Sequence, residues 1–337
     1  MDKWLITGGS GFLGSNIIEN LKKNNIDFIN FDLIEPTLYQ SNFIKGDIRN
    51  KDELLKAIKG CNKIIHAAAS LPLNKKLFNE INIKGTQNLV ELANEFEIEH
   101  FTYISSSSIF GTKHKDVIDE ETIPSPIEKY GKSKYEGELV VNDLLNNNIS
   151  RNFIRSRTIV GKNRLGIFDM LFNFSKNNMP VFLIGKGSNI IQLIDVEEIS
   201  EVIVRLTNQN ISGSFNLGNN DYTTIKNTFE SFIESINSKS KIVHVPIWIS
   251  LISLYLLDKM RLSPFGPWHY RSFHKSCFFE SSKAYEIIDY FPKKSNEDIL
   301  EESFKYYIDN YKFIHENNST HKKKLDLKIF KILNIFK

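Results

Sequence analysis

The sequence has little cysteine and no long hydrophobic run. Its 337 residues contain two cysteines, Cys61 and Cys277, which are too few for a disulfide framework and lack the spacing of a metal site. Two isolated cysteines are typical of small buried side chains in a reducing compartment. The most apolar run, residues 247–257, is too short to cross a bilayer as a helix. The sequence therefore predicts no disulfide-stapled fold, no metal centre and no membrane-spanning helix.

The chain also lacks a general excess of basic residues. Its net formal charge is +3, but residues 321–337 carry six lysines and one aspartate, which leaves −2 for the first 320 residues. Without a basic excess, a protein cannot release counterions from a phosphate backbone, so we expect no nucleic-acid partner. Because a strand-like apolar run begins almost at residue 1, we expect no secretory signal and a cytoplasmic location.

The first residues have the pattern of a dinucleotide-binding βαβ unit. An apolar run at residues 3–7 breaks into a glycine-rich loop, and apolar residues at helical spacing follow from residue 15. Gly8, Gly11 and Gly14 would allow a tight turn, close approach of a pyrophosphate, and packing of the helix on the strand. The phosphates would bind at the helix N-terminus, where unpaired N–H groups and the helix dipole favour negative charge.

A second expected strand ends in Asp32, 21 residues after Gly11. A carboxylate at this place accepts hydrogen bonds from an adenosine ribose and repels a 2′-phosphate. Residues 33–38 contain no arginine that could hold such a phosphate. The alternative for the glycine pattern alone is a plain strand–turn–helix, but strand, loop, helix, strand and acid in this order predict an NAD site.

Strands and helices alternate through the first half of the chain. The expected strands are 3–7, 27–32, 43–47, 63–69, 100–105 and 151–155, and the expected helices include 51–59, 79–96 and 130–145. This alternation predicts an α/β fold, a doubly wound parallel sheet of the Rossmann type. The looser second half predicts helices at 165–176, 197–206, 224–236, 247–260 and 296–307, and strands at 181–184, 192–196, 214–217 and 241–245.

Three segments of the chain are expected on this basis. Residues 1–157 would form the NAD-binding Rossmann domain, to which some later elements return. Residues 158–312 would form mainly a smaller α/β substrate-binding lobe, and residues 313–337 a basic amphipathic tail.

A tyrosine and a lysine open the expected helix at 130–145. Tyr130 and Lys134 are four residues apart and so share one helix face. A tyrosine with its reference pKa of about 10 is a poor base at neutral pH. A nearby ammonium stabilises the phenolate and lowers that pKa, and the lysine can also reach a cofactor ribose. The alternative for this pair, taken alone, is a solvated helix start.

The expected strand at 100–105 runs into four consecutive serines, Ser105 to Ser108. Ligands bind beyond the carboxyl ends of parallel strands, so a serine there can hold a substrate hydroxyl against the tyrosine. A serine-rich strand end is usually a turn when taken singly. Together with the glycine loop and the Tyr130–Lys134 pair, it predicts an active site.

These motifs resemble the extended short-chain dehydrogenase/reductase family, which contains nucleotide-sugar epimerases and dehydratases. The resemblance covers residues 1 to about 310 and is carried by 7–14, 46–49, 66–69, 82–86, 103–111, Tyr130 with Lys134, 154–161 and 215–218. It implies that Asp47 and Ile48 flank the adenine and that Ala67 lines the cofactor cleft. The implied cofactor-binding residues are Gly8, Gly11, Phe12, Leu13, Gly14, Asp32, Asp47, Ile48, Ala67, Tyr130 and Lys134. The implied catalytic residues are Tyr130, Lys134 and Ser106, which lies five residues before Gly111.

Departures from the family pattern narrow the expected chemistry. Family dehydratases follow the catalytic hydroxyl with an Asp-Glu pair, and decarboxylases of nucleotide-uronic acids carry a Glu there. Here those positions are Ser107 and Ser108, so both reactions are disfavoured. The epimerase–reductases that make deoxysugars add a Cys and a His, and no cysteine lies near this serine run. Hydride chemistry at one carbinol remains.

The substrate-binding positions also depart from the pattern. Ile191 replaces an arginine that often grips the diphosphate of a sugar nucleotide, and residues 195–198 read Asp-Val-Glu-Glu instead of His-Val-Asp-Asp. Thr158 stands where the family often has an asparagine. Arg271 is a candidate for the lost diphosphate contact, and the alternative is a surface arginine lying over aromatic residues. The candidate substrate residues are Ser107, Thr158 and Arg271.

The expected function is NAD-dependent 4-epimerisation of a nucleotide sugar through a keto intermediate, in polysaccharide biosynthesis. One alternative is a 3β-hydroxysteroid- or flavonol-type dehydrogenase of the same family, which the absent arginine at position 191 favours. Another is a nucleotide-sugar 4-ketoreductase. A non-enzymatic alternative is an NAD-sensing scaffold, which would leave the Tyr130, Lys134 and Ser106 set unexplained.

The C-terminal tail has the pattern of a basic amphipathic helix. Its apolar residues share one helix face, namely Leu325, Ile329, Ile332, Leu333 and Phe336, and its lysines lie outside this stripe. Such a helix favours peripheral docking on an anionic membrane, here the inner face of the cytoplasmic membrane. The alternative is a helix that packs on its own protein or on the second subunit of a homodimer.

Overall fold

The computed structural model describes residues 2–70, 77–96, 98–111, 117–162, 167–260 and 274–311. The chain divides into two compact units. The first unit comprises Met1–Ile159, Ile194–Gly218 and Phe279–Pro292, and the second comprises Val160–Leu193, Asn219–Phe278 and Lys293–Lys337. Arg271 and the tail from residue 313 lie outside the described residues, so their expected roles stay predictions.

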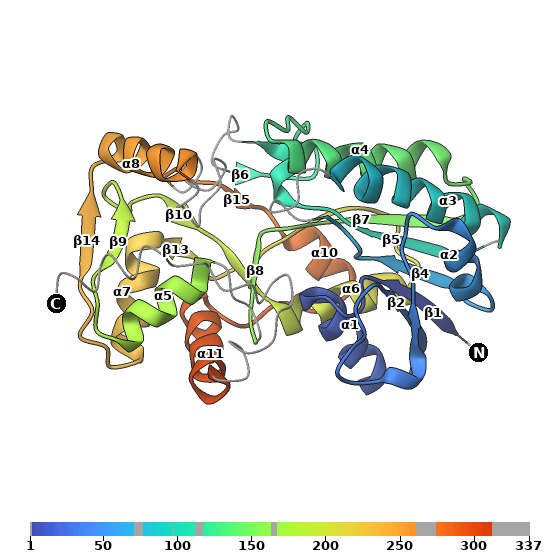
Figure 1. Ribbon diagram of the computed structural model, residues 1–337, viewed down its shortest axis with the longest axis horizontal. Helices are drawn as coiled ribbons and strands as arrows, with labels where there is room; N and C mark the ends of the chain where they lie inside the picture. Colours follow the sequence, from blue (N-terminus) through green and yellow to red (C-terminus); the bar gives the residue numbers. More distant parts are fainter. Residues whose placement is uncertain are drawn as a thin grey trace. The chain divides into compact units, whose positions relative to one another are not determined.

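The first unit is built on a seven-stranded parallel sheet with the order β12-β7-β5-β4-β1-β2-β3 (Figure 1). The strands are β1 (Lys3–Thr7), β2 (Asp27–Asp32), β3 (Phe43–Lys45), β4 (Lys63–His66), β5 (His100–Ile104), β7 (Ser150–Ser156) and β12 (Gly213–Leu217). Every pairing in this sheet is parallel. The order reverses between β1 and β4, which is where a doubly wound sheet opens a crevice for a ligand at its carboxyl edge. The expected fold class is confirmed.

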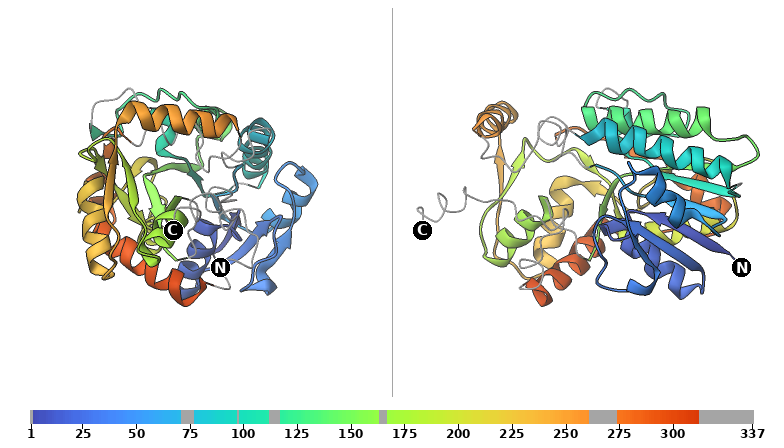
Figure 2. Two further views of the ribbon diagram at one scale, coloured as in Figure 1. Left: turned by 60° about the vertical axis from the view of Figure 1, so that its left-hand side comes forward. Right: turned by 45° about the vertical axis from the view of Figure 1, so that its right-hand side comes forward.

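Helices cover both faces of this sheet (Figures 1 and 2). One face carries α1 (Phe12–Lys23), α6 (Val196–Asn208) and α10 (Ser282–Ile287), and the other carries α2 (Lys51–Ile58), α3 (Thr86–Glu95) and α4 (Lys129–Leu144). The side chains of β1 alternate between them: Trp4 and Ile6 belong to the first core, and Leu5 belongs to the second. Both faces of a parallel sheet are buried, which is why its strands read as nearly continuous apolar runs.

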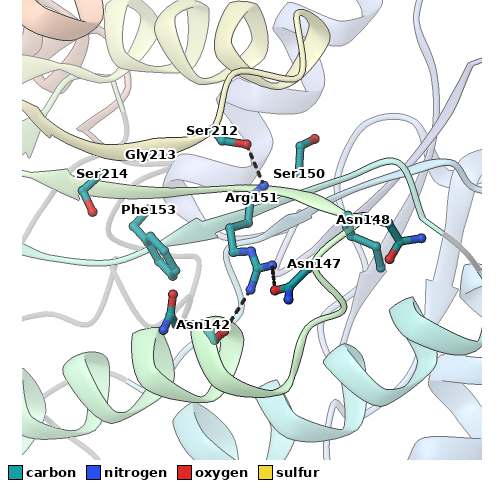
Figure 3. A pocket seen from close by; sticks show the side chains of 10 residues that line it. Asn142, Asn147, Asn148, Ser150, Arg151, Phe153, Ser212, Gly213 and Ser214 are labelled. Atoms are coloured by element: carbon teal, nitrogen blue, oxygen red, sulfur yellow. Dashed lines mark hydrogen bonds between the residues drawn. The ribbon is translucent and has the colours of Figure 1, made fainter.

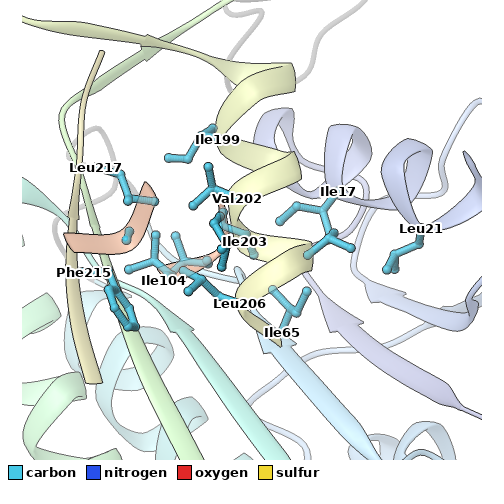
Figure 4. Packing of buried hydrophobic residues seen from close by; sticks show 14 of the residues in the cluster. Ile17, Leu21, Ile65, Ile104, Ile199, Val202, Ile203, Leu206, Phe215 and Leu217 are labelled. Carbon is cyan, nitrogen blue, oxygen red and sulfur yellow. The ribbon is translucent and has the colours of Figure 1, made fainter. Parts of the chain in front are cut away.

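The core under α1 and α6 is mainly aliphatic, with a few aromatic side chains such as Phe215 (Figure 4). Ile17 of α1, Ile65 of β4 and Val202 of α6 are each fully buried there. Burial of one such side chain contributes about 1.5–3 kcal/mol. This core fixes α1, and therefore the glycine loop before it, against the sheet.

The second unit is smaller and mixed in structure. Its helices are α5 (Ile167–Lys176), α7 (Ile225–Ser235), α8 (Ile247–Lys259) and α11 (Asn296–Asp309). β9 (Val181–Ile184) pairs in parallel with β14 (Ile242–Val245), and β10 (Ile190–Ile191) pairs with β13 (Thr223–Thr224). Its core combines aliphatic side chains with a group of aromatic rings, in which Phe172 lies 5.7 Å from Phe232 and 5.5 Å from Tyr307 between ring centroids. The remaining short elements of the whole described chain are two 3₁₀ helices, η1 (Gln40–Asn42) and η4 (Ser107–Phe110), and the strands β6 (Val117–Ile118), β8 (Thr158–Val160), β11 (Leu193–Asp195) and β15 (Phe278–Phe279).

Several short strands, such as β6, β8, β10 and β15, were not expected from the sequence, and two helical regions also differ from the expectation. The single helix expected over 79–96 is a π-helical segment, η3 (Phe78–Gly85), followed by α3 (Thr86–Glu95), and π-helical segments of this kind are frequent at functional sites. The helix α10 was not expected at all. It has six residues and little periodic signal of its own, and its fully buried Ala284 and Tyr285 hold it by tertiary packing.

Candidate active site

The glycine loop makes close backbone contacts that exclude any side chain. Gly8 has a φ of +74°, and a Cβ on it would lie 2.6 Å from the backbone nitrogen of Ala68. A Cβ on Gly14 would lie 2.1 Å from the carbonyl oxygen of Gly8. The loop therefore packs the start of α1 directly on the ends of β1 and β4, and only glycine fits at these two positions.

The N-terminus of α1 faces this loop without a side-chain cap. Gly11 is the N-cap residue, no side-chain hydrogen bond caps the helix, and the first turn holds no acidic residue. The first N–H groups of a helix have no intrahelical partner, and the helix dipole adds partial positive charge there. Gly11, Phe12, Leu13 and Gly14 could therefore form a cradle for a phosphate or pyrophosphate at the switch point of the sheet.

Asp32 lies at the carboxyl end of β2 and is tied to the glycine loop. Its two carboxylate oxygens accept hydrogen bonds from the backbone N–H groups of Ser10 (3.0 Å) and Ile34 (3.0 Å). Burial raises the pKa of Asp32, and these hydrogen bonds act in the opposite direction. The acid is therefore held beside the phosphate cradle, where a dinucleotide presents its ribose hydroxyls.

The three residues expected to contact the adenine or to line the cofactor cleft, Asp47, Ile48 and Ala67, differ from one another in their surroundings. The Asp47 carboxylate pairs with Arg49, whose side chain lowers the pKa of Asp47 by hydrogen bonding. Ile48 is buried and packs on Gly85, where a Cβ would lie 2.7 Å from an Ile48 methyl carbon. Ala67 follows β4 and donates its backbone N–H to Thr7. Their contacts with an adenine stay a prediction.

Tyr130 and Lys134 lie in the first turns of α4 and differ in burial. Tyr130 is half-buried, with its ring 5.9 Å from that of Phe78, whereas the side chain of Lys134 is buried. The Lys134 ammonium lies 4.1 Å from the centre of the Tyr103 ring. Burial lowers the pKa of Lys134 to about 7, and the nearby Glu138 partly offsets this. A buried lysine of this kind is expensive to maintain and is typical of a functional site.

Two glycines let α4 approach the sheet and the serine run closely. A Cβ on Gly131 would lie 2.3 Å from the carbonyl oxygen of Ser108, and one on Gly137 would lie 2.0 Å from the Tyr103 hydroxyl. Glycine inside a helix costs about 1 kcal/mol relative to alanine, so its presence here reflects this packing. The structure thus brings the start of α4 and the serine run into contact.

Ser106 adopts an extended conformation and caps the turn η4. Its hydroxyl oxygen accepts hydrogen bonds from the backbone N–H of Ser108 (3.2 Å) and from the Ser108 hydroxyl (3.0 Å). With its lone pairs engaged in this way, the hydroxyl hydrogen of Ser106 is available to donate to a substrate oxygen. Ser107 is half-buried at the first position of η4.

Asn82, whose role is not evident from the sequence, anchors the start of α4. Its side-chain oxygen accepts from the backbone N–H of Ser70 (2.6 Å), and its amide donates to the Ser133 hydroxyl (2.9 Å). Ser133 in turn donates to the carbonyl oxygen of Tyr130 (2.8 Å). The buried Asn82 therefore links the end of β4 to the backbone of Tyr130. Its pattern in the sequence, Asn-Ile-Lys-Gly-Thr, was the available signal.

His66 is fully buried between strand and helix. Its two ring nitrogens lie 2.7 Å from the Thr7 hydroxyl and 3.0 Å from the Thr86 hydroxyl. Burial, together with the positive charge of Lys134, lowers the pKa of His66 to about 3. The imidazole is therefore neutral and joins β1 to α3. Within the described residues, no group of His, Cys, Asp and Glu side chains is arranged to hold a metal ion.

A buried ion pair ties α4 to β7. Arg155 donates to both carboxylate oxygens of Glu138, at 3.1 and 2.8 Å, and both side chains are more than 90% buried. The guanidinium also lies 5.4 Å from the centre of the Phe110 ring, at the end of η4. Glu138 is one helical turn after Lys134. The pair therefore fixes the helix that carries Tyr130 and Lys134 against the strand beside β5.

The candidate substrate residues are only partly located. Thr158 is a half-buried residue of β8, and Arg271 lies outside the described residues. Ile191, at the position of the missing arginine, is half-buried in β10. Asp195 caps α6 by accepting the backbone N–H groups of Glu197 and Glu198, which gives the altered motif a structural role.

A pocket of about 400 Å³ lies elsewhere in the first unit (Figure 3). Ser150 and Arg151 at the start of β7 and Gly213 at the start of β12 line it, so it lies at the amino edge of the sheet, opposite the catalytic residues. The Arg151 guanidinium donates to the backbone carbonyls of Val141 and Asn142 and so caps the end of α4. Arg151, which lines this pocket, therefore stabilises the end of α4, and the pocket lies outside the candidate site.

Known proteins resemble this chain in sequence and in fold. Residues 4–218 match the model of the NAD dependent epimerase/dehydratase family. The chain is 27% identical over 262 residues to the human (Homo sapiens) sterol-4-alpha-carboxylate 3-dehydrogenase, decarboxylating, a match covering 72% of this chain and 69% of that protein. It is 24% identical over 268 residues to the N-acetyl-alpha-D-glucosaminyl-diphospho-ditrans,octacis-undecaprenol 4-epimerase of Escherichia coli O157:H7, covering 76% and 79% of the two chains.

The fold is also that of a solved epimerase. The UDP-glucose 4-epimerase of Thermotoga maritima, crystallised with UDP-glucose, superposes with a TM-score of 0.74 at 20% identity, covering 92% of this chain and all of that one. The family match spans the glycine loop, Asp32, Ser106, Tyr130 and Lys134. The chain belongs to the NAD-dependent epimerase/dehydratase family, and it is an NAD-dependent enzyme.

Proposed function

We propose that this enzyme is an NAD-dependent 4-epimerase of a nucleotide sugar that serves polysaccharide biosynthesis. The observation that supports the proposal is the close approach of the Ser108 backbone to Gly131, in the first turn of the helix that carries Tyr130 and the buried Lys134. Similarity to a UDP-glucose 4-epimerase and to an epimerase of a lipid-linked amino sugar supports it.

The first unit fits NAD through the cradle formed by Gly8, Gly11 and Gly14 and through Asp32. When bound, NAD supplies a hydride acceptor and, later in the same cycle, a hydride donor at one carbinol carbon. The residues of this chain supply the proton chemistry and the positioning.

Tyr130 would accept the proton of the sugar 4-hydroxyl and return it after the keto sugar has presented its other face. Lys134 would stabilise the phenolate that this requires, and the Ser106 hydroxyl would donate to the reacting oxygen and orient it. The side chains that follow Ser106 are hydroxyls and carry no second acid–base pair for removal of water. One carbinol can therefore be oxidised and reduced, and dehydration is not supported.

A panel of sugar nucleotides tests the proposal. The purified enzyme is incubated with each compound and NAD, without added reductant, and the products are separated by chromatography. Interconversion of a pair of 4-epimers is the expected result. Oxidation of a 3β-hydroxysterol, with none of the sugars converted, would replace the proposal by a dehydrogenase, the reaction named for the human relative.

Asp32 predicts the choice between NAD and NADP. NAD should bind at least about tenfold more tightly, because the fixed carboxylate of Asp32 would face a 2′-phosphate, and one unfavourable contact of about 1.4 kcal/mol gives this factor. Residues 33–38 offer no arginine to offset it. Calorimetric titration of both cofactors measures the ratio, and Asp32→Asn should reduce it. Equal affinities for the wild-type enzyme would show that Asp32 does not face the ribose.

Lys134→Met should lower turnover at least about tenfold, because it removes the positive charge beside the developing phenolate. It should not destabilise the fold. Burial lowers the pKa of Lys134 to about 7, whereas the unfolded chain keeps that proton to about pH 10. Stability therefore rises with pH between these values, and the full cost of burying the charge is present below pH 7.

The variant should accordingly gain most in stability, relative to the wild type, below pH 7. Urea unfolding at pH 6 and pH 9 checks this together with the rate assay. A variant that is both less stable at pH 6 and fully active would assign Lys134 a purely structural role.

A further inference from the structure

Helix α8 presents an apolar stripe that its own unit leaves exposed. The stripe consists of Trp248, Ile249, Ile252, Tyr255 and Leu256, with Met260 directly after the helix. The exposed fraction is 66% for Trp248, 54% for Ile252 and 53% for Leu256. These positions recur every three or four residues and so share one side of the helix. Large contiguous apolar patches on a protein surface mark interaction sites.

The opposite side of α8 is anchored to the second unit. Ser250 is buried, and its hydroxyl donates to the carbonyl oxygen of Val245 at 3.4 Å. A Cβ on Gly185, in the turn after β9, would lie 2.9 Å from a side-chain carbon of Ile247. β14 leads through Pro246 directly into the helix (Figure 2). The stripe therefore lies on the side of α8 opposite the buried Ser250.

A second exposed apolar pair lies on the strands that support α8. Phe182 of β9 and Val243 of β14 are direct neighbours in the parallel pairing and are 51% and 38% exposed. The strand that leads into α8 thus carries exposed apolar surface as well. The exposed apolar surface of the second unit therefore includes residues outside α8.

Most of the formal charges in the segment that carries this surface are positive. The chain contains no aspartate or glutamate from residue 235 to residue 257 and one, Asp258, near the end of α8, whereas Lys239 and Lys241 are exposed just before the helix. Lys186 is exposed in the turn beside Ile247, and Lys259 is exposed at the end of α8. Independently, the sequence of residues 321–337 has a net charge of +5. An apolar stripe with a basic surround is complementary to an anionic lipid surface.

The length of α8 excludes a spanning role. Its 13 residues reach about 20 Å at 1.5 Å per residue, against a hydrocarbon core of about 30 Å. No helix in the described part of the chain is long and apolar enough to cross a membrane. A helix of this length, with Trp248 and Tyr255 in its stripe, suits the plane of the interface between headgroups and acyl chains.

We propose that α8 docks this enzyme on the surface of an anionic lipid bilayer, with the stripe inserted at the headgroup boundary. A second copy of the chain is a poorer occupant, because pairing two such surfaces would place their basic surrounds against each other. The inference concerns where the enzyme works, and it holds for any substrate of the active site.

Flotation with vesicles tests this docking on the full-length protein. Vesicles of phosphatidylcholine with phosphatidylglycerol are compared with vesicles of phosphatidylcholine alone. The test variant is Ile252→Ser with Leu256→Ser, and the matched control is Ile287→Ser with Leu144→Ser, whose side chains are 48% and 45% exposed in the first unit. All four side chains are exposed, so both variants should fold.

Wild type and control should float with the anionic vesicles, and the test variant should partition at least about tenfold less. The fluorescence of Trp248 should shift to the blue on binding, and Trp248→Phe should remove the shift. Flotation of the test variant equal to that of the wild type would overturn the proposal, as would absence of flotation for every protein. A wild-type dimer that the test variant converts to a monomer, without flotation, would assign the stripe to a second copy instead.

Discussion

Replacing Tyr130 with phenylalanine is expected to lower turnover by about 10²- to 10⁴-fold, the range that general acid–base catalysis contributes. The substitution removes only the hydroxyl, because the ring that packs at 5.9 Å from Phe78 remains. The hydrogen bond from Ser133 to the backbone of Tyr130 is also unaffected. Stability and NAD affinity should therefore stay close to the wild-type values, which urea unfolding and calorimetry can check.

Tyr135 supplies the matched control for this variant. It lies on the same helix, five residues later, and has no assigned role in the site. Tyr135→Phe should leave turnover unchanged, so a loss confined to Tyr130→Phe locates the effect at one hydroxyl. A Tyr130→Phe enzyme with wild-type activity would remove Tyr130 from the proton transfer.

Arg155→Met is expected to destabilise the enzyme by about 3–5 kcal/mol, the largest stability effect of any change considered. The substitution leaves the carboxylate of Glu138 buried without its charged partner, at a place where both side chains are more than 90% buried. It should also reduce turnover, because Glu138 is on the helix that carries Tyr130 and Lys134. Urea unfolding of the full chain measures the change in stability.

Two further variants test whether the destabilisation comes from leaving the buried carboxylate of Glu138 without a charged partner. Glu138→Leu combined with Arg155→Met should recover much of the stability, because no uncompensated charge remains. Lys51→Met breaks the exposed ion pair with Glu91, whose side chains are 45% and 41% exposed, and should cost no more than about 1 kcal/mol. Equal costs for Arg155→Met and Lys51→Met would show that the pair is solvated in solution.

The sheet and the glycine loop could be predicted from the sequence because both depend on residue patterns within short segments of the chain. Strands such as β1 and β2 are buried on both faces and read as apolar runs, and the glycines at 8 and 14 are required by contacts within one βαβ unit. The spacing of Tyr130 and Lys134 on one helix is also local. That the serine run touches this helix followed from the position of strand ends in a parallel sheet.

Features that depend on distant contacts could not be predicted. The Glu138–Arg155 pair joins α4 to β7, and nothing in the sequence indicates that these two residues meet. Asn82 contacts Ser70 and Ser133, which are 12 and 51 residues away in the sequence, and local periodicity does not reveal such contacts. The short helix α10 is likewise held by packing and has no signal of its own. The exposed stripe of α8 also has no local signal, because an apolar helix of this length normally indicates a core element.

The most direct test of the proposed epimerase is the fate of a deuterium label at C4 of the sugar. The nucleotide sugar that the enzyme converts is prepared with deuterium at C4 and incubated with enzyme and NAD, and the product and the absorbance of NADH are followed together. The account predicts that the 4-epimer keeps its deuterium and that NADH does not accumulate. Loss of the label into released NADH, with a keto sugar as the stable product, would contradict it and assign the enzyme to net oxidation.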